Sequence, residues 1–253
     1  MRVDLNADLG EGFGPWRMGD DAAMLAIVTT ANIACGFHAG DPTIMRDTVA
    51  AAKAAGVAVG AHPGFADLAG FGRRRLPGVS AREFETIVAY QIGAFAAIAA
   101  LAGHPMTHVK THGALGNMCA DDDDLALAVA RAIHAVDSEL AFMVMPGTAT
   151  ERAAERIGLR PIREIYADRT YADSFNLTPR NEPNAMVDDP AEALTRVLDM
   201  VGEGHIVSTT GKLLKVGIDS VCVHGDSPHA VAMARTLRNG LTAAGVDVRP
   251  TLS

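Results

Sequence analysis

The sequence predicts one α/β domain, covering residues 1–253, in which parallel strands close into a TIM-barrel-like (β/α) barrel. Two observations support this fold class. Short apolar runs alternate with longer helical patterns along the chain, and about seven such runs occur. The chain also has the length that one barrel needs, so a second domain is not required. A doubly wound open sheet is the alternative arrangement of the same units.

The apolar runs are the expected strands, and helical patterns separate them. They cover residues 3–8, 31–37, 57–61, 108–110, 140–145, 162–166 and 221–224. The stretch 168–188 has little periodicity and is richer in proline, asparagine and arginine. We therefore expect it to form a long functional loop.

Capping residues indicate where the intervening helices begin and end. A capping side chain precedes a proline at three expected starts, which are Asp41-Pro42, Asp189-Pro190 and Ser227-Pro228. Ser80 and Glu83 have the spacing of a capping box ahead of a long, alanine-rich helix. Left-handed helix ends are expected at Gly56, Gly158 and Gly245.

Composition narrows the class of protein. The net charge of −8 argues against a nucleic-acid partner. No apolar run reaches the ~18 residues that span a bilayer, and the N-terminus has no export-signal pattern. We therefore expect a cytoplasmic protein without membrane contact. Cys35, Cys119 and Cys222 lack C-x-x-C spacing, which favours reduced, buried thiols.

Reactive side chains lie on or directly after several of the expected strands. On the first strand, Asp4, Asn6 and Asp8 share one face because side chains alternate along a strand. Four other strands are followed by candidate pocket residues, which are His38 with Asp41, His62, Lys110 with His112, and His224 with Asp226. Parallel barrel strands end on one face, so these side chains are expected to line one pocket. Taken singly, Asp41 could instead cap a helix and any one histidine could be a core residue.

The residue types in this pocket suit proton transfer or hydrolysis at a carbonyl. Histidine titrates near neutral pH, an aspartate can orient it or act as a base, and Lys110 can stabilise negative charge. No G-x-S-x-G elbow is present, which argues against serine catalysis. No H-E-x-x-H or similar spacing appears either, so we assign no metal ligands, and a divalent metal remains an open alternative.

Phosphate-binding motifs are not identified. The glycine-rich run 10–14 is followed by Pro15, which breaks the dinucleotide spacing, and the run 204–212 lacks the P-loop spacing. The basic run 73–75 is either a solvated turn or a clamp for a carboxylate or phosphoryl oxygen.

Taken together, these segments closely resemble the LamB/YcsF family, whose members are the A subunits of 5-oxoprolinase. The segments that match are 4–12 (DLNADLGEG), 31–41 (ANIACGFHAGD), 60–64 (GAHPG), 70–74 (GFGRR), 108–110 (HVK) and 222–226 (CVHGD). The chain departs from the family at Thr111, where a proline is usual, and at Gly116, where a tyrosine is usual. The resemblance implies an irregular seven-stranded barrel, related to glycoside hydrolase and deacetylase barrels.

The resemblance also implies an activity and a set of site residues. The implied reaction is ATP-dependent opening of 5-oxoproline to glutamate, with ATP as co-substrate and two other 5-oxoprolinase subunits, B and C, as partners. We assign catalytic roles to Asp8, His38, His62, Lys110 and His112. We assign substrate binding to Asn6, Glu11, Asp41, Arg74, Arg169, His224 and Asp226. The alternatives are a metal-dependent deacetylase and a non-catalytic ligand-binding subunit, and Asp8 and Lys110 could form a buried ion pair instead of acting chemically.

Overall fold

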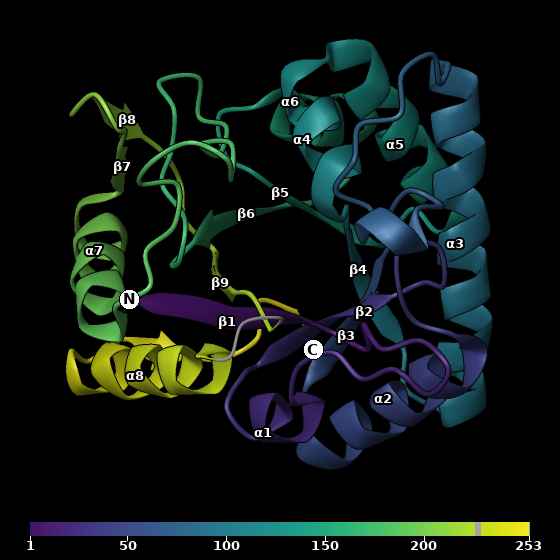
Figure 1. The fold of residues 1–253 in the computed structure, drawn as a ribbon, viewed down its shortest axis with the longest axis horizontal. Coiled ribbons are helices and arrows are strands. Elements are labelled where there is room, and N and C mark those ends of the chain that lie inside the picture. Colours follow the sequence, from purple (N-terminus) through teal and green to yellow (C-terminus); the bar gives the residue numbers. More distant parts are fainter. Residues whose placement is uncertain (226–228, 253) are drawn as a thin grey trace.

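The computed structural model describes residues 1–225 and 229–252 and has a closed barrel of parallel strands at its centre (Figure 1). The barrel strands are β1 (Arg2–Leu9), β2 (Thr30–Ala34), β3 (Ala58–His62), β4 (Met106–Lys110), β5 (Ala141–Val144), β6 (Pro161–Tyr166) and β9 (Ser220–Val223). They follow one another in this order, and β1 pairs with both β2 and β9. Because the first and last strands pair, the sheet has closed on itself, and the doubly wound alternative is excluded.

All seven expected strands are present, with small shifts at their ends. The largest difference is in β2, which was expected to run to residue 37 and ends at Ala34. Gly36 has a φ of 96°, a conformation that glycine adopts at little steric cost, and its amide donates to the carbonyl of Ala39. The chain therefore turns immediately after β2 and brings His38 back over the end of the barrel.

Helices surround the barrel, as Figure 1 shows. They are α1 (Asp21–Leu25), α2 (Pro42–Ala55), α3 (Ala81–Ala102), α4 (Gly113–Asp121), α5 (Asp123–Val136), α6 (Ala149–Ile157), α7 (Pro190–Glu203) and α8 (Ala230–Ala243), with a 3-10 turn at Leu68–Gly70. The expected starts of α2 and α7 and the capping box of α3 are confirmed. Gly56 and Gly158 end α2 and α6 in the left-handed conformation, and Gly245, with a φ of 79°, follows the end of α8. The expected start at Ser227-Pro228 lies outside the described residues.

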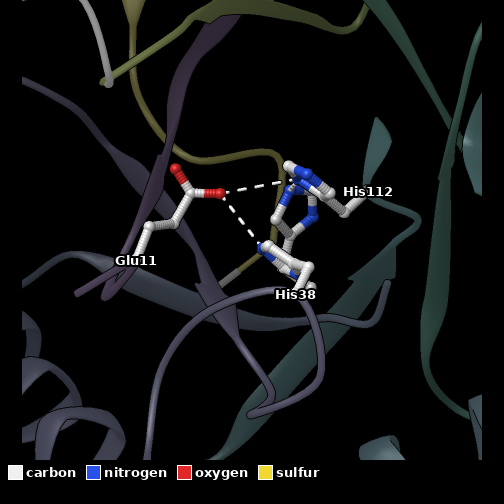
Figure 2. A group of neighbouring side chains, drawn as sticks. Glu11, His38 and His112 are labelled. Carbon is white, nitrogen blue, oxygen red and sulfur yellow. Dashed lines mark hydrogen bonds and ion pairs between the residues drawn. The ribbon is translucent and has the colours of Figure 1, made fainter. Parts of the chain in front are cut away.

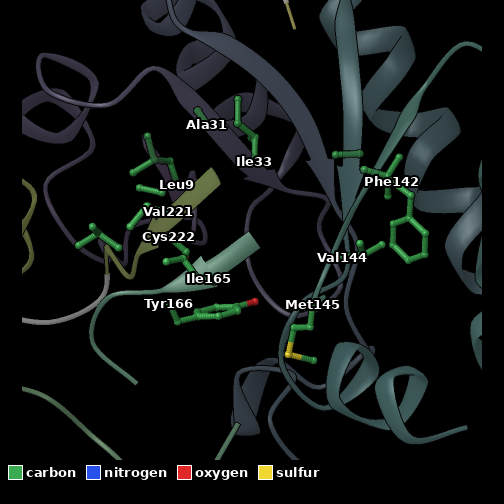
Figure 3. Packing of buried hydrophobic residues seen from close by; sticks show 14 of the residues in the cluster. Leu9, Ala31, Ile33, Phe142, Val144, Met145, Ile165, Tyr166, Val221 and Cys222 are labelled. Carbon is green, nitrogen blue, oxygen red and sulfur yellow. The ribbon is translucent and has the colours of Figure 1, made fainter. Parts of the chain in front are cut away.

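The apolar core lies between the strands and the helices. On β1, Val3, Leu5, Ala7 and Leu9 are buried in this layer together with apolar residues of the helices. Figure 3 shows the same packing for other strands, where Ile33 of β2, Val144 of β5 and Val221 of β9 belong to the cluster. Burying such side chains stabilises the fold by roughly 1.5–3 kcal/mol each.

The inside of the barrel is polar, in contrast to this outer layer. Asp4, Asn6 and Asp8 alternate with the apolar residues of β1 and are at most 6% exposed. Hydrogen bonds satisfy them, and the carboxylate of Asp4 accepts from the hydroxyls of Thr30 and Ser220. Buried polar groups are costly unless they are paired, so this network fixes the side chains on which the site is built.

Helix α3 is, within the described part of the chain, the one helix long and apolar enough to cross a membrane, with a mean hydropathy of 1.6 over its best window. Its side chains Phe84, Val88, Ile92 and Phe95 are fully buried. They belong to the core cluster that also contains β3 and β4, so in this fold α3 packs as an outer helix of the barrel.

Three short strands were not predicted from the sequence. β7 (His205–Val207) and β8 (Leu213–Lys215) form an antiparallel hairpin outside the barrel, and β10 (Asp247–Val248) pairs with the start of β1. The loop 168–188 lies between β6 and α7, as expected, and short bridges such as Arg169 with Met186 fold it back on itself.

Candidate functional site

A cavity of about 680 Å³ opens at the carboxyl ends of the barrel strands. This volume is within the range of small-molecule sites. Its lining combines strand-end side chains with residues of α4 and the loop 168–188. The strand-end residues among them are Asp8, His62, Lys110, Thr111, His112, Met143, Val144, Met145, Glu164, Tyr166 and His224. The expected convergence of the strand ends on one pocket is therefore confirmed for Asp8, His62, Lys110, His112 and His224.

Lys110 is the centre of a buried ion-pair network at the base of this cavity. Its ammonium lies 2.8 Å from a carboxylate oxygen of Asp8 and 2.8 Å from one of Glu164. The side chains of all three residues are at most 7% exposed. The Lys110 ammonium also lies 3.1 Å from the Cys222 sulfur and 5.2 Å from the centre of the Tyr166 ring. The sequence left open whether Asp8 and Lys110 form an ion pair, and the structure has that pair.

The network keeps both partners charged. Burial alone would lower the pKa of Lys110, but the neighbouring carboxylates of Asp8 and Glu164 outweigh it and hold that pKa well above its usual value. Burial alone would raise the pKa of Asp8, but interactions with His62 and Lys110 hold it well below its usual value. The cavity floor therefore presents an ammonium and a carboxylate at neutral pH.

Four residues form a second cluster beside this network, which we call the histidine cluster: Glu11, His38, His62 and His112. All four are buried, and one ligand atom of each lies within 4.8 Å of the others. Figure 2 shows the Glu11 carboxylate facing His38 and His112, with distances of 3.2 Å to His38 Nε2 and 3.5 Å to His112 Nδ1. The rings of His38 and His112 stack at 3.6 Å, and His62 meets both edge-on.

A polar layer below the cavity holds the catalytic candidates in place. The Asn32 amide donates to Asn6 and Asp8, each at 2.8 Å, and its carbonyl oxygen lies 2.8 Å from His108 Nε2. Thr107 lies 2.9 Å from the other ring nitrogen of His108. Desolvation in this layer lowers the pKa of His108 to about 3, so the ring is neutral in the folded protein.

Arginines and the loop 168–188 form the rim of the cavity. Arg73, Arg75, Arg169 and Arg180 belong to the lining. His224 Nδ1 lies 2.7 Å from the Asp168 carboxylate, an ion pair that joins the end of β9 to the start of the loop. Tyr166 N donates to the Tyr171 hydroxyl at 2.7 Å, which fixes the loop to β6. A cationic rim over a carboxylate and an ammonium suits a small anionic ligand.

Several predicted site residues lie elsewhere. Asp41 caps α2 through the amides of Thr43 and Ile44 and does not line the cavity, which favours the capping alternative over substrate binding. Arg74 points to Asp67, with which it forms an ion pair, and its neighbours Arg73 and Arg75 line the cavity instead.

Three others lie behind the cavity wall. Asn6 is fully buried below Asp8, where it binds Ser220 and Asn32, and it cannot reach a ligand directly. Glu11 and His38 belong to the histidine cluster and do not line the cavity itself. Asp226 lies outside the described residues, so its assignment stays a prediction.

Some site residues were missed by sequence reasoning. Glu164 and Tyr166 alternate with the outward-facing Ile165 on β6. A charged residue inside an apolar strand is unusual, and this could have identified Glu164 as a site residue. Asp168 lies two residues after the end of the same strand. Asn117 and Asn176 also line the cavity, and the spacing of α4 and of the loop gave no signal for them.

The cysteines and the glycine-rich runs have structural roles. The three cysteines are free and buried, as expected. Burial raises the pKa of Cys35 to about 12 and raises that of Cys119 and Cys222 as well, so the thiols stay protonated. The run 10–14 forms the turn after β1 and is followed by residues 15–20 before α1 begins, and the run 204–212 begins the β7–β8 hairpin. Neither run therefore leads directly into a helix N-terminus, as a phosphate loop does.

Known proteins resemble this chain over its full length. Residues 3–253 match the family model described as the LamB/YcsF family. A protein from Rhodopseudomonas palustris, named as the A subunit of 5-oxoprolinase, is 56% identical and covers 99% of this chain and 98% of its own. A protein of the same name from Nitrobacter hamburgensis is 52% identical, with the same coverage. The crystal structure of a lactam utilization protein from Thermus thermophilus is 45% identical, with a TM-score of 0.92, and covers 98% of this chain and 99% of its own.

More distant structures resemble the chain in fold alone. A peptidoglycan N-acetylglucosamine deacetylase from Eubacterium rectale has a TM-score of 0.53 at 10% identity, covering 99% of this chain and 88% of the deacetylase. Identity this low carries no argument about activity. The likeness does show that the barrel has a fold similar to that of the deacetylases, as the family resemblance implied.

Proposed function

Because the chain belongs to the LamB/YcsF family, we propose that it is one subunit of a 5-oxoprolinase and that its cavity binds the lactam during ring opening. The relatives named as 5-oxoprolinase subunits, together with the lactam utilization protein, support the substrate class. The single observation that carries the catalytic part is the buried Asp8–Lys110–Glu164 network at the floor of an arginine-rimmed cavity.

The proposed reaction couples ring opening to ATP. Transfer of the γ-phosphoryl group to the lactam oxygen makes the ring carbon a better electrophile. Water adds to that carbon, the C–N bond breaks, and the nitrogen takes up a proton. A second water releases phosphate, so one 5-oxoproline, one ATP and two waters give one glutamate, ADP and phosphate. Both 5-oxoproline and its phosphorylated form are anionic, which matches the cationic rim formed by Arg73, Arg75, Arg169 and Arg180.

Asp8 and Lys110 are the proposed catalytic pair. The Asp8 carboxylate stays ionised because its pKa is held low, so it accepts a hydrogen bond from the attacking water and orients it. The Lys110 ammonium stabilises the negative charge of the phosphorylated intermediate beside the attacked carbon. Glu164 lies 2.8 Å from the same ammonium and positions it.

We propose that partner subunits, B and C, supply the ATP site. The two glycine-rich runs of this chain are a turn and a hairpin, and ATP is larger than the lactam the cavity is proposed to hold. This division is consistent with the word subunit in the names of the relatives.

A reconstitution assay tests the proposal. The pure chain, the two partner subunits, and the three together are each given ATP and 5-oxoproline, and glutamate and ADP are measured. We expect glutamate and ADP in equal amounts from the full mixture only. Robust ATP-dependent turnover by the isolated chain contradicts the division of labour, and a full mixture that forms no glutamate contradicts the function.

A further inference from the structure

The histidine cluster of Glu11, His38, His62 and His112 has an arrangement of ring nitrogens that hydrogen bonding between its own members does not explain. His62 Nδ1 lies 2.8 Å from the carbonyl oxygen of Lys110, and His112 Nε2 lies 2.8 Å from that of Phe71. A carbonyl oxygen can only accept, so each of these ring nitrogens carries the proton and donates it. In the neutral rings, His62 Nε2 and His112 Nδ1 are then both acceptors.

These two acceptor nitrogens face each other at 3.1 Å. Two lone pairs at this distance repel each other unless a positive charge lies between them. A divalent metal cation meets this requirement, because it accepts lone pairs from several neutral imidazoles at once.

Three contacts within the cluster match the edges of a tetrahedral site, and all four ligand atoms lie within 4.8 Å of one another. Two ligand atoms, each ~2.0–2.1 Å from an ion, lie about 3.3 Å apart at the tetrahedral angle. The contacts in the cluster are 3.1 Å between His62 Nε2 and His112 Nδ1, 3.2 Å between His38 Nε2 and Glu11 Oε1, and 3.5 Å between His112 Nδ1 and Glu11 Oε1. The rings of His38 and His112 are stacked in parallel planes, so one of them must rotate for both nitrogens to point at one ion.

The surroundings of the cluster are also those of a metal site. Histidine ligands usually donate their second nitrogen to a carbonyl or carboxylate, as His62 and His112 do here. Glycine makes room for the rings, since a Cβ at Gly64 would lie 2.5 Å from His38 Nδ1 and one at Gly72 would lie 2.7 Å from His38 Cβ. The Asp8 carboxylate lies 3.3 Å from His62 Nε2 and adds negative charge next to the cluster.

We propose that Glu11, His38, His62 and His112 bind one divalent transition-metal ion, of which zinc is the best match to a buried set of three imidazoles and one carboxylate. The ion would adjoin the wall of the ring-opening cavity, because His62 and His112 belong both to the cluster and to the lining. It would supply Lewis-acid chemistry next to Asp8. The inference does not depend on the proposed substrate.

Metal binding can be measured without any activity assay. The full-length chain is stripped with a chelator and titrated with Zn²⁺, and with Co²⁺ as a spectroscopic probe. We expect one ion per chain and the intense visible bands of four-coordinate cobalt. Glu11→Gln and His112→Ala should each weaken binding by more than about 100-fold, since losing even an outer contact of a ligand commonly costs 10–100-fold.

His224→Ala is the matched control, because His224 also pairs with a buried carboxylate at the cavity but lies outside the cluster. It should bind the ion as the parent does. Glu11→Gln preserves the shape of the side chain, and a melting curve of the stripped protein shows that the variant is folded. Failure of the parent to take up stoichiometric Zn²⁺ or Co²⁺ at micromolar concentration overturns the proposal, and so does unchanged binding by both cluster variants. Either result leaves the reconstitution assay to decide the proposed function separately.

Discussion

The Lys110 ammonium lies 2.8 Å from both Asp8 and Glu164, so this one side chain affects stability as well as chemistry. On sequence alone, replacing Lys110 could have been expected to remove activity and leave the fold intact. The buried pair changes that expectation, because removing the lysine leaves two carboxylates without their cation inside the barrel.

Lys110→Ala should therefore lower the free energy of unfolding by about 3–5 kcal/mol, in addition to abolishing turnover. Chemical denaturation measures this loss. Arg46→Ala is the control, because Arg46 forms an exposed pair with Asp47 and should change the stability by less than about 1 kcal/mol. Equal stabilities of the Lys110 variant and the parent would contradict the buried network.

The neutral histidines predict how stability depends on pH. His108 has a pKa of about 3 in the fold, whereas it titrates near ~6.5 in an unfolded chain. Between these values the unfolded state binds the extra proton, so stability falls as the pH is lowered, by up to about 1.4 kcal/mol per pH unit for each such histidine. His38 and His112, whose pKa values burial also lowers, act in the same direction.

Denaturation of the parent and of His108→Gln between about pH 5 and 7 measures this effect above the range where carboxylates titrate. The variant should have a slope smaller by about 1.4 kcal/mol per pH unit in the acidic half of the range. Identical slopes would mean that His108 is not neutral in the folded protein.

We predict that Gly64 is needed for activity because its lack of a side chain leaves room for the His38 ring. A Cβ at this position would lie 2.5 Å from His38 Nδ1, so Gly64→Ala should displace His38 and lower turnover of the assembled enzyme by at least about 10-fold. Gly93→Ala is the control, because a Cβ there meets nothing within 4 Å, and it should leave turnover unchanged. A Gly64→Ala enzyme as active as the parent would show that the position of His38 is not critical.

At the residue scale, the sequence predicted the site residues that lie at strand ends. It missed site residues that only contacts distant in sequence bring into the cavity. Asp8, His62, Lys110 and His112 follow from strand ends alone, because a parallel barrel collects them. The partner of Lys110 on β6, Glu164, is far away in the sequence, and no local spacing links the two.

At the scale of elements, capping chemistry located helices well because it is local. Asp41 illustrates this, since it was assigned both a cap and a ligand role and the structure gives it the cap. The hairpin of β7 and β8 and the two-residue β10 were missed because such short strands have no measurable alternation. Their pairing depends on contacts distant in sequence.

Asp41→Ala should destabilise the protein by about 1 kcal/mol, the usual cost of losing an N-cap, without changing turnover of the assembled enzyme. Asp47→Ala is the control, because it removes an exposed carboxylate from the same helix, and it should change neither the stability nor the turnover. Thermal melting and the coupled assay measure the two quantities. A drop in turnover for the Asp41 variant, with stability unchanged, would restore the ligand role.

At the scale of the whole molecule, the alternation of strands and helices predicted the fold class, and the closure of the barrel came from pairing that no single segment encodes. β1 pairs with β9, more than two hundred residues later in the chain. The family resemblance implied a seven-stranded barrel, and the structure has one. The polar interior was only partly visible in the sequence, because Asp4, Asn6 and Asp8 could equally have faced solvent.

The proposed chemistry depends on the charge of Asp8, and one substitution tests it most directly. Asp8→Asn keeps the size of the side chain and an oxygen near Lys110, while Glu164 still neutralises the ammonium. It should therefore remain folded and assemble with the partner subunits. The measurement is 5-oxoproline-dependent ATP hydrolysis and glutamate formation by the reconstituted complex carrying Asp8→Asn. We predict a loss of roughly 10²-fold or more in glutamate formation, with melting temperature and assembly close to those of the parent. Near-normal glutamate formation by the folded variant would contradict the placement of ring opening at Asp8.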